Sequence, residues 1–308
     1  MNIVEELRKQ SLENIFNQQT FSNCFDIWKH EINSILGDNY NFNRMLNLGD
    51  NLSSIFKSTN QKGRGQNVLS GGGYAWEGFV VWYLNFLFIG SRGVAIKNSL
   101  SPKMIKDALS VNYGSFKSNT ESDIIVLIFP DNDDFRDDFT NLNIIDSNGN
   151  PITHHHRGKP NVKGIINELV NLHLGELEVG NIQCKTNWND NAQIPMLWNM
   201  IYLSNGFAES NITVGNDGTS IRDFNRFTYS FVTVPSGKSI YKSESTAVNR
   251  VRNLSGGNFW GKESQNQVAS SIKEIFNRNF SSAFNTHRNT VNRVLNEGNE
   301  LLDVFRLN

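Results

Sequence analysis

The stretch Ser122-Asp123-Ile124-Ile125-Val126-Leu127-Ile128-Phe129 decides the fold. From Ile124 to Phe129 every residue is apolar, most are β-branched, and Pro130 closes the run. Such a run is typical of a strand that is buried on both faces, in the middle of a sheet. Asp123 stands directly before it, so the sequence predicts a carboxylate at the start of a buried strand.

Helices and strands are predicted on both sides of this stretch. Residues 175–186 and 227–234 have the pattern of strands, and residues 161–172 that of a helix. The apolar segment 74–89 is long enough for a buried helix. We therefore predict an α/β or α+β fold with a central mixed β-sheet flanked by helices.

Both ends of the chain have a helical pattern. Apolar residues recur three and four positions apart in residues 1–60, and again from residue 264 to the C-terminus, where we expect long amphipathic helices. With 308 residues and no low-complexity linker, we predict a single domain. Its expected parts are a helical region 1–73, a core 74–205 and a C-terminal region 206–308.

The composition excludes several classes of protein. The chain is 38% apolar and has no uninterrupted apolar run of the length that spans a membrane, so we expect no membrane partner. The segment 79–89 is too short and contains Asn85. Its N-terminus lacks the pattern of a secretory signal. Two cysteines cannot form a disulfide framework or a zinc site, and a reducing cytoplasm fits them.

The charges are separated along the chain, although 29 basic and 30 acidic residues give a formal net charge of -1. Residues 121–146 carry eight carboxylates and one basic residue, Arg136. Residues 222–262 carry seven basic residues and two acidic ones, interleaved with aromatic and asparagine side chains. The basic stretch is either a solvated face or a surface for DNA, because Lys and Arg bind phosphates while Arg and Asn read base edges.

Polar side chains also mark the end of the second predicted strand. Gln183 and Lys185 are two residues apart, so in a strand they face the same side. An aspartate, an amide oxygen and a lysine brought together at strand ends are suited to bind Mg²⁺ and activate water. Lys185 could orient the attacking water or hold the scissile phosphate. Cys184 faces the opposite way, which favours core packing.

Asp123 with Gln183-x-Lys185 resembles the core motif of the PD-(D/E)xK nuclease superfamily, and the chain is similar to its type II restriction endonucleases. Gln183 replaces the acidic residue of the motif, which removes one charged metal ligand and leaves the number of metal ions open. Glu77 resembles the acidic residue that many members carry on the helix before the active-site strands. The resemblance implies a restriction-endonuclease-like core, with 74–205 as the catalytic part of one nuclease domain.

The resemblance implies a Mg²⁺-dependent enzyme that cuts double-stranded DNA at a short site. Asp123, Gln183, Lys185 and Glu77 are then the catalytic residues, and all but Lys185 are candidate metal ligands. A homodimer is expected because a two-fold site needs two active sites, and a methyltransferase would protect the host DNA. The expected DNA contacts are Arg222, Arg226, Lys238, Lys242, Arg250, Arg252, Asn258 and Lys262.

Other interpretations stay open at this point. The protein could be a non-catalytic DNA-binding protein with a nuclease-like fold, or a repair nuclease that reads DNA shape. Each motif residue could also have a purely structural role. Glu176 and Glu178 are alternative candidates to Gln183 as metal ligands. Asp146 is the alternative candidate to Asp123, although its Asn-Gly context favours a turn residue. Adjacent histidines at 154–156 cannot all bind one ion, which favours a loop that contacts phosphate or solvent.

Overall fold

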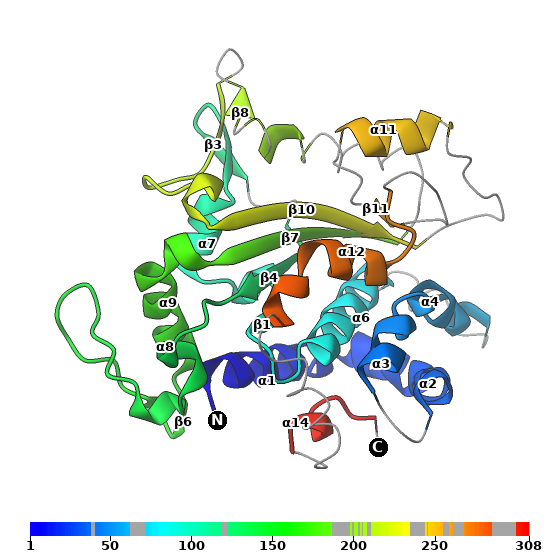
Figure 1. Cartoon of the computed structure of the whole chain (residues 1–308), viewed down its shortest axis with the longest axis horizontal. Coiled ribbons are helices and arrows are strands. Elements are labelled where there is room, and N and C mark those ends of the chain that lie inside the picture. The colour runs from blue at the N-terminus through cyan, green and yellow to red at the C-terminus, as the bar shows by residue number, and fades with distance from the viewer. Residues whose placement is uncertain are drawn as a thin grey trace.

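The computed structural model describes most of the chain. The described residues are 1–37, 41–61, 72–118, 122–186, 198, 200–202, 204, 206–207, 211–234, 244, 246–254, 259–260, 268–284 and 300–307. Within them the protein is a mixed α/β fold whose main sheet is covered by helices on both faces, as the sequence predicted (Figure 1). No described helix has the length and apolarity needed to cross a membrane.

The main sheet has five strands among the described residues, in the order β1-β4-β7-β10-β11. Strand β4 is antiparallel to both of its neighbours, β1 and β7, whereas β10 runs parallel to β7 and β11 parallel to β10, so the sheet is mixed. The strands span Gly93–Lys97 (β1), Ile124–Ile128 (β4), Glu178–Lys185 (β7), Arg226–Thr233 (β10) and Phe259–Trp260 (β11).

Strand β4 is buried on both faces, which confirms the prediction for the apolar stretch that follows Asp123. Ile124 and Val126 belong to one hydrophobic core, and Ile125 and Leu127 to another. Successive side chains of a strand point to opposite faces, so one continuous apolar run supplies both cores. This position fixes β4 as the centre of the antiparallel part of the sheet.

The first core lies between the sheet and the helices of the N-terminal region together with α6 (Gly72–Leu87). In Figure 1 these helices, blue and cyan, lie together on one side of β7 and β10. The ring of Trp28 stacks on Phe79 with centroids 4.5 Å apart, which joins α2 to α6. The N-terminal helices are α1 (Ile3–Phe16), α2 (Gln19–Leu36), α3 (Phe42–Leu48) and α4 (Leu52–Gln61).

The second core lies on the opposite face, under α7 (Lys103–Ala108) and α9 (Val162–Leu172). Helix α9 begins after Asn161, whose side chain accepts a hydrogen bond from the Gly164 amide, as expected of an N-cap. Short elements complete this side: α8 (Asp133–Arg136), η1 (Asn98–Leu100), η2 (Phe139–Asn141), η3 (Leu174–Glu176), η6 (Ile221–Asp223), β5 (His155–His156) and β6 (Lys159–Pro160).

A second, smaller sheet was not predicted. Its order is β3-β2-β9-β8, with strands Val111–Tyr113 (β2), Phe116–Ser118 (β3), Gly206–Phe207 (β8) and Ile212–Val214 (β9). All its pairs are antiparallel. Figure 1 shows β3 and β8 together at the edge of the molecule, away from the N-terminal helices.

Strand β1 is an edge strand, and side chains from two helices cover its outer edge. Arg8 donates from Nη2 to the Gly93 carbonyl over 2.6 Å. The Asn85 amide donates to the Ala95 carbonyl over 2.7 Å and accepts from the Ala95 amide over 3.0 Å. Unpaired strand edges invite pairing with other chains, so this cover also protects β1 from aggregation.

The long C-terminal helices predicted from residue 264 onward are not present as such in the described residues. Helix α12 spans only Ile272–Asn279, the chain then tightens into η7 (Ser281–Phe284), and α14 spans Glu300–Asp303. Phe276, Phe280 and Phe284 all belong to the first core. The 3₁₀ turn after α12 keeps these rings in the core while the backbone changes direction.

His173 joins α8 to the end of α9. Its Nδ1 lies 2.8 Å from Glu176 and its Nε2 lies 2.8 Å from Asp134. Burial lowers the pKa of His173, but the hydrogen bonds and charges of Glu176 and Asp134 outweigh burial and raise it above its ordinary value of 6.5. The imidazolium therefore stabilises this corner of the fold.

We expect the stabilising effect of His173 to depend on pH. Because its pKa is raised in the folded state, its contribution is complete below the unfolded-state pKa and is lost as pH rises through the folded-state pKa. The difference in free energy of unfolding between wild type and His173→Gln, measured by urea titration, should be larger at about pH 6 than at about pH 9. A difference that stays constant or grows over this range would contradict the assignment.

Candidate active site

Asp123 lies at the junction of three strands. The pairing of Ile124 with Ile182 in the β4–β7 register places Asp123, one residue earlier, opposite Gln183. The Cys184 amide donates to Asp123 Oδ2 over 2.6 Å, and the Asn98 amide donates to the Asp123 carbonyl over 3.1 Å. The start of β4 is thereby bonded to the end of β1 and to the end of β7.

Gln183 and Cys184 point to opposite faces of β7. Gln183 is 1% exposed, and its Oε1 accepts a hydrogen bond from the Tyr229 hydroxyl over 3.0 Å. Cys184 belongs to the first core with Val232, its partner on β10, which confirms that it packs in the core. The amide oxygen predicted to bind metal is thus held by a tyrosine on the neighbouring strand.

Lys185 is the last residue of β7 and is half-buried. It pairs with Thr233 of β10, and its carbonyl accepts from the Val234 amide over 3.1 Å. These backbone contacts fix where the side chain leaves the sheet. Its position two residues after Gln183 is the one that the motif predicts.

Glu77 lies near the start of α6, the helix that precedes the strands, as predicted. Its Oε2 accepts from Nζ of Lys97 over 3.0 Å. Lys97 ends β1, pairs with Ile124 and places its ammonium 3.1 Å from the centroid of the Tyr74 ring. The carboxylate of Glu77 is therefore engaged in an ion pair.

Lys97 and Tyr229 are the residues of this site that sequence reasoning missed. Lys97 closes the short apolar run Gly93-Val94-Ala95-Ile96, just as Lys185 closes the run of β7. That repeated pattern was a usable signal for a second lysine at a strand end. Tyr229 lay within a predicted strand, but no local pattern indicated its contact with Gln183.

The pKa of the buried Cys184 thiol depends on charges from several elements. Burial raises the pKa of the Cys184 thiol well above its ordinary value, and the charges of Asp123 and Glu77 raise it further. The charges of Lys97 and Lys185 act on the same thiol in the opposite direction. The charged residues that affect this pKa thus come from α6, from the ends of β1 and β7 and from the residue before β4, and the raised pKa favours the protonated thiol.

The donor atoms of this cluster are compatible with Mg²⁺, which prefers hard oxygen ligands and retains several waters. Asp123 and Glu77 supply carboxylates, whereas the side chain of Gln183 is turned toward Tyr229. In the described part of the chain, no three His, Cys, Asp or Glu side chains are grouped closely enough to hold a metal ion. Oδ2 of Asp123 accepts from the Cys184 amide, and Oε2 of Glu77 accepts from Lys97, so each carboxylate has a hydrogen-bond donor.

The substitutes considered for these residues lie elsewhere. Glu178 pairs with Ile128, at the opposite end of β4 from Asp123 and roughly 17 Å along the strand. Glu176 contacts His173. Asp146 accepts from the amides of Asn148 and Asn150, as expected of a turn residue. None of the three therefore replaces Gln183 or Asp123 in the cluster.

The histidine segment also has a structural explanation. His154 Nε2 lies 2.6 Å from the Leu142 carbonyl oxygen. His155 and His156 form β5 in a short two-stranded ladder and are exposed, in agreement with the expected contact with solvent.

The described residues of the predicted DNA surface have different environments. Arg222 and Arg250 are exposed, on η6 and on α11 (Thr246–Leu254). Arg252 donates to Asn249 over 2.6 Å. Arg226 donates to the carbonyls of Asn279 and Arg278 and is 3.4 Å from Glu178, so it also ties α12 to the sheet. The predictions for Lys238, Lys242, Asn258 and Lys262 lie outside the described residues.

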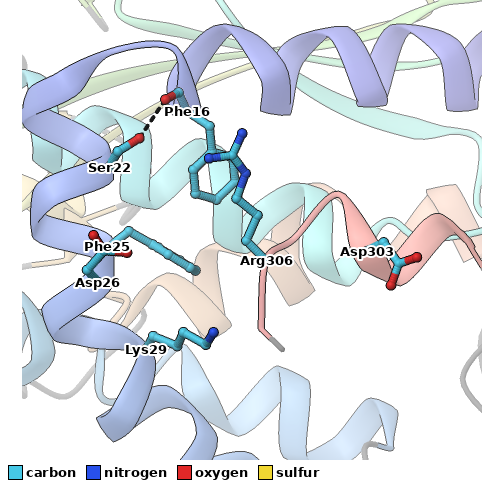
Figure 2. A pocket seen from close by; sticks show the side chains of 7 residues that line it. All are labelled: Phe16, Ser22, Phe25, Asp26, Lys29, Asp303 and Arg306. Atoms are coloured by element: carbon cyan, nitrogen blue, oxygen red, sulfur yellow. Dashed lines mark hydrogen bonds between the residues drawn. The ribbon is translucent and has the colours of Figure 1, made fainter.

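A separate pocket of about 370 Å³ lies between α2 and the C-terminal segment (Figure 2). The Arg306 guanidinium lies over the Phe16 ring, 4.4 Å from its centroid, and Ser22 donates to the Phe16 carbonyl. Its other lining residues are Phe25, Asp26, Lys29 and Asp303. The pocket includes none of the four predicted catalytic residues. We therefore treat the strand ends, and not this pocket, as the candidate active site.

Comparison of the sequence with protein-family models found no match, and a search of curated proteins found none either.

Proposed function

We propose that this protein is a Mg²⁺-dependent endonuclease that hydrolyses phosphodiester bonds in double-stranded DNA, of the type II restriction class. One observation carries the proposal: the backbone amide of Cys184, between Gln183 and Lys185, donates to Oδ2 of Asp123, so the Asp and Gln-x-Lys ends of two paired strands are bonded directly. Glu77 lies on α6, the helix that precedes these strands, and is paired with Lys97 at the end of β1. A helix with an acidic residue that precedes antiparallel strands with Asp and Gln-x-Lys at their ends is the arrangement that the nuclease resemblance predicts.

In this proposal the residues at the strand ends each have a defined role. Asp123 holds Mg²⁺, and the Cys184 amide fixes the orientation of its carboxylate. The bound ion would stabilise the negative charge that develops on the phosphate and lower the pKa of an attacking water. Lys185 orients that water or binds the scissile phosphate through its ammonium group. The Tyr229 hydroxyl holds the side-chain amide of Gln183.

Cleavage of both strands at a short site further implies a homodimer. Arg222 and Arg250 are exposed and suited to phosphate contacts, which predicts an affinity for DNA that falls as salt rises. A restriction role also implies location in the cytoplasm with the host DNA and a methyltransferase that protects it.

The direct test is incubation of plasmid DNA with the protein and Mg²⁺, followed by mapping of the ends. Discrete fragments with a common end sequence are the expected result. Random nicking would instead identify a repair nuclease that reads shape. Intact DNA in a range of sequence contexts, with retained DNA binding, would overturn the catalytic proposal.

A non-catalytic DNA-binding protein is the second candidate, and three contacts favour it. The side chain of Gln183 is engaged by Tyr229 and that of Glu77 by Lys97, and Oδ2 of Asp123 accepts from the Cys184 amide, so all three predicted metal ligands already have partners. This candidate predicts DNA binding that Mg²⁺ does not convert into cleavage. The plasmid experiment therefore separates the two candidates directly.

A further inference from the structure

The ion pair between Glu77 and Lys97 is the most specific feature of the charged cluster. The Lys97 side chain is 6% exposed and that of Glu77 is 23% exposed, with 3.0 Å between Nζ and Oε2. The face of the Tyr74 ring contacts the same ammonium. A buried ammonium is costly unless it is paired, so Lys97 needs both the carboxylate and the ring.

The position of Lys97 links this pair to the proposed metal site. The residue after it, Asn98, donates its backbone amide to the Asp123 carbonyl. Lys97 also pairs with Ile124, the residue after Asp123, in the β1–β4 register, so the ion pair adjoins the strand start that carries Asp123. A cation bound to Glu77 would be repelled by the ammonium of Lys97, which already occupies that carboxylate. A cation bound to Asp123 would leave the ion pair between Glu77 and Lys97 intact.

We propose that Lys97 takes the place of a second metal ion at Glu77, so that the site binds one divalent cation per chain, on Asp123. Lys97 is then a positioning residue that keeps the Glu77 carboxylate out of the coordination sphere of the ion. This inference rests on the proposed metal site. It answers a question that the Gln183-x-Lys185 motif leaves open, namely how many ions bind.

The number of bound ions can be measured without any reaction. Ca²⁺ is also bound through oxygen ligands, so we would titrate Ca²⁺ into the full-length protein and follow the heat of binding. Wild type should bind one ion per chain, and Lys97→Met, which releases Glu77, should bind two. Lys185→Met is the matched control: it removes a positive charge from the same cluster but not from Glu77, and should still bind one ion.

Two further variants test the role of each carboxylate. Glu77→Gln should bind one ion with an affinity close to that of wild type, and Lys97→Met combined with Glu77→Gln should also bind one. Asp123→Asn should weaken the single ion of wild type at least about tenfold, since it removes the charge of the proposed ligand. Circular dichroism checks the fold of each variant, and Glu77→Gln decides the question if Lys97→Met does not fold.

Several results would overturn the inference: two ions or none in wild type, one ion in folded Lys97→Met, or a lost ion in Glu77→Gln. The plasmid experiment separates these results from failure of the proposed function. Cleavage of DNA by a protein that binds two ions would contradict only the proposed role of Lys97. One bound ion without cleavage would contradict the proposed nuclease function and would still support the role of Lys97.

Discussion

Lys185→Ala is expected to lower the rate of DNA cleavage by about a hundred- to a thousandfold, the usual effect of removing one group that stabilises charge in a transition state. Lys185 ends β7, and the amide of the residue before it, Cys184, donates to Oδ2 of Asp123. The backbone of Lys185 is therefore adjacent to the carboxylate that is proposed to hold the ion. The measurement is the single-turnover rate of plasmid cleavage in Mg²⁺.

The control for this variant should remove a lysine far from the cluster. Lys159 lies in the exposed β5–β6 ladder, and Lys159→Ala should cleave at the wild-type rate. DNA binding without Mg²⁺ should be similar in all three proteins, because other basic residues supply most phosphate contacts. Cleavage by Lys185→Ala at the rate of the Lys159→Ala control would exclude Lys185 from the chemistry.

The longer strands of the main sheet could be predicted from the sequence. The uninterrupted apolar run around Ile125 became β4, which is buried on both faces. The segments around Ile182 and Phe231 became β7 and β10, although polar residues interrupt their apolar pattern. Strand β1 was missed because it is short and follows directly on the apolar segment of α6. Its separate identity depends on pairing with β4, which lies about thirty residues further along the chain.

The small sheet had no pattern to predict it. Its strands are two or three residues long, and β2 pairs with β9 across about a hundred residues. Asn112 and Lys117 on these strands are polar, and Phe116 is 66% exposed, so alternation of apolar and polar residues is absent. Pairing of this kind is set by the three-dimensional structure and not by the local sequence.

The candidate site was also predictable only in part. The helix with Glu77 and the strands next to Asp123 and Lys185 were expected, and the Cys184 amide bonds to Asp123 across two of these strands. The partners of Glu77 and Gln183 were not expected, since Lys97 is 20 residues from Glu77 and Tyr229 is 46 residues from Gln183. A sequence motif identifies candidate site residues. Which neighbouring side chains bond to them depends on the register of adjacent strands.

Arg8→Met is expected to lower the free energy of unfolding by about 3–5 kcal/mol, the usual cost of removing one partner of a buried ion pair. Arg8 is 1% exposed and pairs through Nη1 with Glu5, while its Nη2 donates to the carbonyls of Gly93 and Ser91. The substitution leaves the buried carboxylate of Glu5 without its counter-charge and the edge of β1 without its cover.

Urea unfolding of the full-length protein measures this loss, with Arg278→Met as the matched control. Arg278 also pairs with a glutamate, Glu274, but its side chain is 35% exposed and the distance is 3.4 Å. A surface ion pair of this kind contributes at most about 1 kcal/mol. Adding Glu5→Gln to Arg8→Met should restore part of the stability, because no carboxylate is then left unpaired in the core. Equal losses for Arg8→Met and Arg278→Met would show that Arg8 does not hold α1 to the edge of the sheet.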